Sequence, residues 1–131
     1  MSTGSRPDTA TLMCPENLTS PMQIFQLPDL GEKLPAPRAS YREFLRIPSM
    51  SCGVYSLPAG SYDPQVPHNE DEIYYATSGE GRVRVGSEDQ PVRPGTIVFV
   101  PKGEEHNFHS ITEDLVLLVI FSPAETPAGE S

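Results

Sequence analysis

The chain has 131 residues, a length that suits one domain with a single hydrophobic core. Its net charge of −9 repels phosphate backbones, and its nine Lys and Arg residues form no basic stripe, which argues against nucleic acid as a partner. The 15 Pro and 10 Gly residues favour many short strands over long helices. The composition therefore predicts an all-β protein.

Both ends of the chain differ from its middle in composition. Residues 1–20 are rich in Ser, Thr, Pro and Gly and lack an apolar period, so we expect a flexible N-terminal tail. Residues 123–131 have the same character and predict a flexible C-terminal tail. The domain itself is expected over residues 21–122. Because the N-terminus carries neither a secretory nor a transit pattern, a cytoplasmic location is expected.

Short apolar segments separated by turn residues follow one another through the domain, as in antiparallel sandwiches and barrels. The segments predict eight strands, over residues 22–27, 42–47, 52–57, 72–78, 81–86, 96–100, 106–111 and 115–121. Turns are expected between them, including residues 78–81 and 86–90. The last segment is far shorter than the roughly 20 apolar residues that span a bilayer, so we expect a buried strand and no membrane partner.

Histidines are the side chains in this sequence best suited to metal chemistry. The chain has three, His68, His106 and His109. Reading "EIYYATS" as a strand puts Glu72 and Tyr74 on one face, and His106 begins a later strand. If those two strands are neighbours, two imidazoles and the Glu72 carboxylate converge inside a barrel. This ligand set suits Fe(II) with open coordination positions, and Mn, Zn, Ni, Co and Cu are also compatible.

Two spaced motifs run through the second half of the domain. The first has the form G-x5-H-x-H-x3-E-x6-G, and its positions are Gly60, Val66, His68, Glu72 and Gly79. The second has the form G-x5-P-x-G-x2-H-x3-N, and its positions are Gly95, Pro101, Gly103, His106 and Ser110. Every spacing fits, but Val66 stands where the pattern has histidine and Ser110 where it has asparagine. With these motifs the chain resembles the cupins, a family of small β-barrels.

The resemblance implies a single cupin domain, a jelly-roll-like antiparallel β-barrel that binds one divalent transition metal. By this resemblance His68, Glu72 and His106 inherit the role of metal ligands. It also implies pairing as a homodimer, through outer sheet faces or through exchanged N-terminal strands. The apolar segment 22–27 is the candidate for such an exchange, because an isolated strand after a polar tail must pair somewhere.

The departure at Val66 leaves one coordination position without a ligand, since valine cannot bind a metal. Gln65, Glu70 and solvent are the alternatives that could fill it. Gln65 is adjacent, but a regular strand would point it away from Val66. It can therefore help only if Pro67 distorts the backbone.

Several of these residues also have a purely structural interpretation. His68 and His106 would be hydrogen-bonded structural residues in a cupin that has lost its metal. Glu70 and the acidic residue after it are expected to face solvent, as blocks of acid usually do. His109 follows His106 by three residues and is expected outside the barrel. Tyr74 either donates a hydrogen bond in a reaction or packs as plain core.

Taken together, these features predict an enzyme that uses a divalent metal to transform a small organic molecule inside the barrel. Glu72 is the candidate ligand or base, and Tyr74 is the candidate acid. Oxygenase chemistry is the first expectation, and isomerase, lyase or decarboxylase chemistry is the second. The alternative is a non-catalytic cupin that binds a small molecule in the same cavity.

Overall fold

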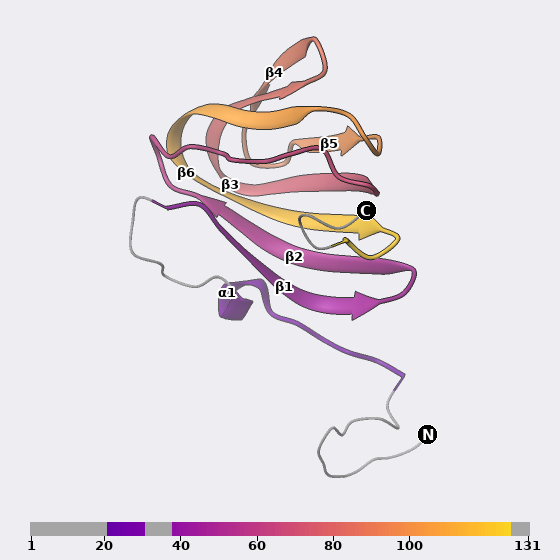
Figure 1. The fold of residues 1–131 in the computed structure, drawn as a ribbon. Helices are drawn as coiled ribbons and strands as arrows, with labels where there is room; N and C mark the ends of the chain where they lie inside the picture. The colour runs from indigo at the N-terminus through magenta and orange to yellow at the C-terminus, as the bar shows by residue number, and fades with distance from the viewer. Residues whose placement is uncertain (1–20, 31–37, 127–131) are drawn as a thin grey trace.

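The structure, a computed structural model, describes residues 21–30 and 38–126 (Figure 1). The flexible tail expected over residues 1–20 lies outside the described residues, and so does 127–131, the end of the expected C-terminal tail. The first described segment ends in a short helix, α1 (Leu27–Leu30). No helix in the described part of the chain is long and apolar enough to cross a membrane.

Within the described residues, six strands form one antiparallel sheet. The strands are β1 (Ser40–Ile47), β2 (Met50–Leu57), β3 (Asp71–Val85), β4 (Glu88–Val92), β5 (Ile97–Val100) and β6 (His106–Ser122). They pair in the order β1-β2-β6-β3-β4, and β5 adds to β3. This arrangement confirms the predicted all-β class.

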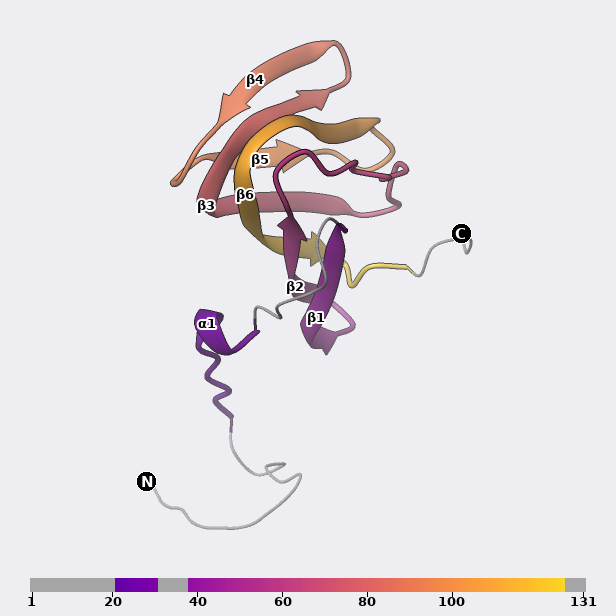
Figure 2. The ribbon, with the colours of Figure 1, turned by 90° about the vertical axis from the view of Figure 1, so that its left-hand side faces the viewer.

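The two longest strands, β3 and β6, give the sheet its curl. They pair along most of their length, and the register shifts between Ala76 and Arg82. Gly79 lies in this stretch with a φ of 93°, and a Cβ there would collide with the carbonyl oxygen of Asp114. Only glycine fits so close an approach at positive φ. The pair bends at this point, from the layer with β1 and β2 into the layer with β4 (Figure 2).

Four of the predicted strands merge into two in the structure. The segments 72–78 and 81–86 belong to one strand, β3, and the segments 106–111 and 115–121 belong to another, β6. The prediction of separate strands was wrong because the glycines and polar residues between them mark bulges and a bend rather than reversals.

Two other predictions about local structure also need correction. The segment 22–27 is no strand: residues 22–26 have no regular structure, and Phe25 packs on Phe44 of β1 with ring centroids 4.8 Å apart. The turn expected over residues 86–90 is shorter, because β4 already begins at Glu88. Gly86, with a φ of 59°, permits the tight reversal between β3 and β4.

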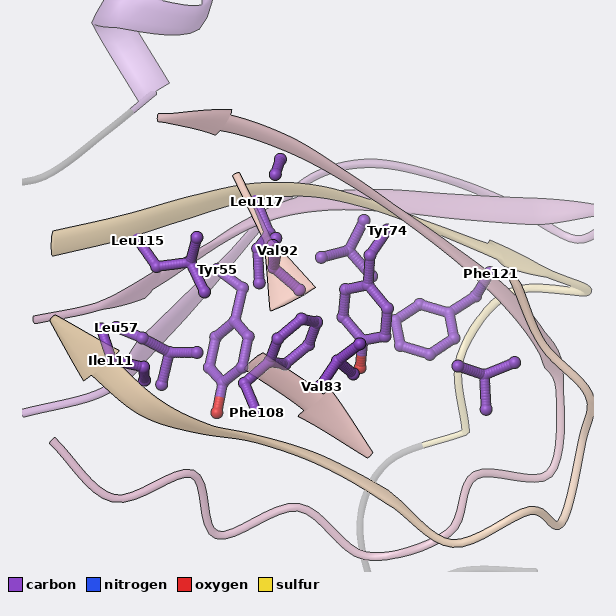
Figure 3. Close-up of a cluster of buried hydrophobic side chains, with 13 residues drawn as sticks. Tyr55, Leu57, Tyr74, Val83, Val92, Phe108, Ile111, Leu115, Leu117 and Phe121 are labelled. Atoms are coloured by element: carbon purple, nitrogen blue, oxygen red, sulfur yellow. The ribbon is translucent and has the colours of Figure 1, made fainter. Parts of the chain in front are cut away.

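Inward-facing side chains of the strands form the hydrophobic core (Figure 3). Burying each large apolar side chain stabilises the fold by about 1.5–3 kcal/mol. The core is continuous with the histidines, since the ring centroid of Phe121 lies 5.0 Å from that of His68 and the centroid of Tyr74 lies 6.0 Å from that of His106. The largest fully buried side chains include Tyr74, Phe108, Leu57, Leu115 and Leu117.

Candidate metal centre

His68, Glu72 and His106 come together in the structure, and we call them the inner cluster. Their potential ligand atoms all lie within 4.8 Å of one another. Glu72 Oε1 is 3.3 Å from His106 Nε2 and 4.0 Å from His68 Nε2. Glu72 and His106 are buried. The structure thus brings together the two imidazoles and the carboxylate, as expected if the strands of Glu72 and His106 are neighbours.

The curl of the β3–β6 pair produces this convergence. Glu72 pairs with Phe121 at one end of the ladder, whereas His106 pairs with Val85 at the other end. At the usual rise per residue of a strand, the two ends of a flat ladder would lie about 40 Å apart. Bending the pair back on itself places Glu72 and His106 face to face, and the segment before β3 delivers His68.

Gln65 completes this group of polar side chains. Its Oε1 atom accepts a hydrogen bond from Tyr74 Oη at 2.6 Å. The same oxygen lies 3.0 Å from His106 Nε2 and 3.3 Å from His68 Nε2. The side chain of Val66, by contrast, is largely exposed. This segment is not a strand, so its side chains need not alternate between two faces. The Gln65 side chain points inward although the neighbouring Val66 is exposed.

The orientation of Gln65 depends on Asp63, a buried residue that the sequence did not single out. Gln65 Nε2 donates to Asp63 Oδ2 at 2.9 Å, and the main-chain N–H of Phe108 donates to the same oxygen at 2.7 Å. Tyr55 Oη donates to Asp63 Oδ1. Because a carboxylate only accepts hydrogen bonds, it holds the NH2 group of Gln65 and leaves the amide oxygen facing the histidines. Nothing local in the sequence marked Asp63, because the Tyr55 hydroxyl and the Phe108 N–H that hold it come from other parts of the chain.

Hydrogen-bond partners also set the orientation of both histidines. His106 Nδ1 lies 2.9 Å from the carbonyl oxygen of Glu104. A carbonyl can only accept, so this nitrogen carries a proton, and in the neutral imidazole the lone pair of Nε2 faces the inner cluster. His68 Nδ1 lies 3.4 Å from Glu125 Oε2. A carboxylate or carbonyl on the far nitrogen is the usual support of a metal-binding histidine.

Burial and charge shift the pKa values of the inner residues in different directions. Burial lowers the pKa of His68, more than the Glu72 carboxylate raises it. Burial acts the same way on His106, but contacts with Glu72 and with the Glu104 carbonyl raise its pKa overall. Burial raises the pKa of Tyr74 well above its usual value, and Glu72 adds to this. Tyr74 therefore keeps its proton at neutral pH and serves as a hydrogen-bond donor.

The C-terminal segment packs over the barrel beside the inner cluster. The main-chain N–H of Thr126 donates to Glu70 Oε2 at 2.8 Å, and that of Glu125 donates to Ser51 Oγ at 2.9 Å. The prediction that Glu70 faces solvent was wrong, because this segment covers it and leaves only 3% of its surface exposed. Glu125 and Thr126, at the start of the expected C-terminal tail, thus contact β2 and the segment before β3.

His109 lies apart from the inner cluster, as strand alternation predicts. Its Nε2 atom is 2.8 Å from Asp89 Oδ2. Arg84 also binds Asp89 Oδ2, at 3.1 Å, and Arg82 binds Asp89 Oδ1 at 2.9 Å. We call these four residues the outer cluster. The side chains of His109 and Asp89 remain about a quarter exposed, at 27% and 25%.

A cavity of about 240 Å³ opens beside the inner cluster. This volume is below the ~300–1,000 Å³ of pockets that hold drug-sized ligands, so it suits a small molecule. Burial raises the pKa of Glu125 to about 7, with the charges of Glu72 and Glu70 adding to the effect. The lining includes Tyr41, Tyr55, Gln65, His68, Phe121 and Glu125.

The side chains of the inner cluster fit a divalent metal. Glu72 Oε1 is buried and makes no regular hydrogen bond, although it lies 3.3 Å from His106 Nε2. An unpaired buried carboxylate oxygen is costly unless an ion binds it. Two imidazole nitrogens, one carboxylate oxygen and the amide oxygen of Gln65 are atoms that Fe, Mn, Zn, Ni, Co and Cu accept as ligands.

The fold and the inner cluster define a small β-barrel protein with a candidate metal centre at one end of its core. A family model described as "Cupin domain" matches residues 53–121, more than half of the chain. The chain belongs to the cupin family. This match confirms the resemblance that the two motifs predicted.

Comparisons with individual proteins agree with this assignment. An uncharacterized protein of Streptomyces coelicolor is 45% identical over 105 residues, which cover 80% of this chain and 100% of that protein. The solved structure of TT1209 from Thermus thermophilus has a TM-score of 0.69 at 30% identity and covers 79% of this chain and 99% of that one. The L-ectoine synthase of Aliivibrio fischeri is 36% identical over 62 residues, which cover 46% of this chain and 48% of the enzyme. The chain thus matches only about half the length of that enzyme.

Proposed function

We propose that this cupin is a mononuclear metal-dependent enzyme that acts on a small organic molecule inside the barrel. One observation carries the proposal: the ligand atoms of His68, Glu72 and His106 lie within 4.8 Å of one another. Two of these residues also line the cavity, so a bound ion would be accessible to a substrate.

Four side-chain atoms would hold the ion. They are the Nε2 atoms of both histidines, a carboxylate oxygen of Glu72 and the Oε1 atom of Gln65 in the position that Val66 leaves open. A divalent ion bound there would supply Lewis-acid or redox chemistry. The ligand types are compatible with Fe, Mn, Zn, Ni, Co or Cu.

Two side chains would act on the substrate directly. Tyr74 Oη lies 2.6 Å from Gln65 Oε1 and 3.2 Å from His106 Nε2, so it can donate a hydrogen bond to a substrate oxygen at the centre. Glu72 Oε1 has no hydrogen-bond partner, which suits either a ligand or a base. The aromatic side chains of Tyr41, Tyr55 and Phe121 line the cavity beside both residues.

Oxygenase chemistry is the first reaction class that we propose, because two histidines and one carboxylate are the ligand set of non-haem Fe(II) oxygenases. Isomerase, lyase or decarboxylase chemistry is the second, because the same centre can polarise a carbonyl group. Similarity to proteins named L-ectoine synthase supports an enzyme in general and does not select between these classes.

A non-catalytic cupin that captures a small molecule is the alternative, and Gln65 favours it. Its Oε1 atom already lies within 3.3 Å of both Nε2 atoms and of Tyr74 Oη. Gln65 Oε1 therefore has a hydrogen-bond donor, Tyr74 Oη, without an ion. In that case a metabolite would stabilise the protein in a thermal-shift assay equally well with and without excess chelator.

The proposal includes a cytoplasmic homodimer. Apolar side chains stand exposed on the outer face of β3 and β5, where Ile73 pairs with Phe99 and Tyr75 pairs with Ile97. Such a face suits contact with a second copy of the chain. A monomeric mass in light scattering at micromolar concentration would contradict the dimer.

Elemental analysis of protein purified without chelator tests the enzyme proposal. We expect about one equivalent of a transition metal in the wild type and a loss of that metal in His68→Ala and His106→Ala. Substrate screening would then compare metal-loaded with chelator-treated protein. The proposal fails if the wild type holds only trace metal and both variants keep whatever activity the screen finds.

A further inference from the structure

Three aromatic rings line the cavity on the side of β1 and β2. The ring centroid of Tyr41 lies 6.3 Å from that of Tyr55 and 6.3 Å from that of Phe121, and both pairs are close to perpendicular. Figure 3 shows the Tyr55 and Phe121 rings reaching inward from their strands. Gly53 makes room for Tyr41, since a Cβ there would collide with the tyrosine ring. The backbone is thus shaped to hold this ring over β2.

A carboxylate lies beside these rings in the wall of the cavity. The Glu125 carboxylate lines the cavity, and its Oε2 atom lies 3.4 Å from His68 Nδ1. None of the described residues that line the cavity is Lys or Arg. Arg46 lies near, but it binds the main-chain oxygen of Glu125 at 2.5 Å and the side chain of Glu43 at 2.8 Å.

The charged side chains of the cavity therefore favour a cationic ligand group over an anionic one. With Glu72 assigned to the metal, Glu125 is the lining carboxylate that remains for a ligand. A carboxylate or phosphate group on this side would meet Glu125 and no cationic side chain of the lining. An ammonium group would meet the negative faces of aromatic rings and a carboxylate partner, both of which attract cations.

We propose that the Tyr41–Tyr55–Phe121 rings and the Glu125 carboxylate form a subsite for the ammonium group of a small substrate. The other end of that substrate would reach the metal centre, so this inference rests on the proposed function. The substrate class is then a small amine or quaternary ammonium compound with an oxygen donor group. The volume of about 240 Å³ restricts it to a compact molecule.

A pair of matched probes tests the subsite. Choline carries a quaternary ammonium group, and 3,3-dimethyl-1-butanol has the same shape without the charge. We expect the full-length wild type to bind choline at least about tenfold more tightly, the range expected of a desolvated cation among aromatic rings. NMR titration at pH 8.5 measures both dissociation constants.

Variants assign the preference to the proposed residues. Tyr41→Leu removes a ring and Glu125→Gln removes the charge, so each should reduce the preference for choline severalfold. Tyr41→Phe keeps the ring and should retain the preference. Circular dichroism establishes that each variant is folded. Equal binding of the two probes by the wild type, or an unchanged preference in both Tyr41→Leu and Glu125→Gln, overturns the subsite.

His106→Ala separates this inference from the proposed function, because it removes a metal ligand and leaves the aromatic rings in place. Loss of metal with a retained preference for choline supports both proposals. A metal-loaded wild type that does not prefer choline overturns the subsite alone. A wild type that prefers choline but holds only trace metal, with any activity unchanged in His68→Ala and His106→Ala, overturns the enzyme proposal and leaves the cation subsite standing.

Discussion

The inner and outer clusters contain the same kinds of side chain in different surroundings. Each uses a histidine from β6, His106 or His109, and each sets it against a carboxylate, at 3.3 Å from Glu72 or 2.8 Å from Asp89. The side chains of the inner pair are at most 1% exposed, whereas those of the outer pair are 27% and 25% exposed.

The two clusters also differ in whether Lys or Arg side chains pair with the carboxylate. Arg82 and Arg84 bind both oxygens of the Asp89 carboxylate, and His109 completes an exposed ion-pair network. In the described part of the chain, no Lys or Arg pairs with Glu72, and its Oε1 atom has no hydrogen bond. A histidine–carboxylate pair is thus a candidate metal site where it is buried and where no Lys or Arg side chain neutralises the carboxylate.

Loss of a histidine gives the largest expected contrast between the clusters. We expect His106→Ala to weaken metal binding by at least about 100-fold, because loss of an outer-shell partner alone costs about 10–100-fold. His109→Ala, three residues further along the same strand, should leave the affinity unchanged. Competition with a fluorescent chelator measures both values. Equal losses in the two variants would contradict the assignment of the centre to the inner cluster.

The carboxylates that support each cluster give the second contrast. Asp63→Ala should lower metal affinity by about 10–100-fold, because Gln65 loses the acceptor that fixes its amide. It should also lower the free energy of unfolding by about 1–3 kcal/mol, since the Phe108 N–H loses its charged acceptor. The matched control is Asp89→Ala, which should not change metal affinity. Urea denaturation and metal titration of both variants separate stability from binding.

A smaller effect is expected in the pH dependence of the metal-free protein. Glu125 has a pKa of about 7 in the folded protein against 4.5 as a free side chain, so between these values the folded state binds more protons than the unfolded state. Stability should therefore fall as the pH rises from about 5 to 7. Glu125→Gln should remove part of this decline.

Urea denaturation at pH 5 and pH 7 in the presence of chelator checks this expectation. Glu105→Gln, at an exposed position, is the control and should keep the slope of the wild type. A slope in Glu125→Gln as steep as that of the wild type would show that Glu125 does not titrate in this range.

The smallest effect is expected for the ion pairs of the outer cluster. Arg84→Ala should change stability only slightly, because exposed pairs contribute little and salt screens them. The difference from the wild type should shrink in about 1 M NaCl. A large loss of stability that persists in high salt would mean that the outer cluster is structurally more important than its exposure indicates.

The fold class and the inner cluster followed from the sequence because they depend on spacing. The two motifs fix where Glu72 and His106 lie relative to the glycines of the turns, and alternation placed His109 on the other face. Strand boundaries were less predictable, because a bulge and a hairpin use the same residue types. Gly79 marks a bend within β3, whereas Gly86 marks a true reversal.

The environments of Gln65 and Glu70 could not be predicted because they depend on contacts distant in sequence. The amide of Gln65 is oriented by Asp63, which is itself held by the N–H of Phe108 on β6. Glu70 is buried because Thr126 reaches it from the other end of the chain. No local pattern carries that information.

Anomalous diffraction from crystals of the protein purified without chelator tests the central claim most directly. Data collected on both sides of the absorption edge of the bound metal should show one peak. The account predicts it about 2.0–2.2 Å from His68 Nε2, His106 Nε2, a Glu72 oxygen and Gln65 Oε1. A peak at the outer cluster instead, or no peak at the inner cluster in metal-containing crystals, would contradict it.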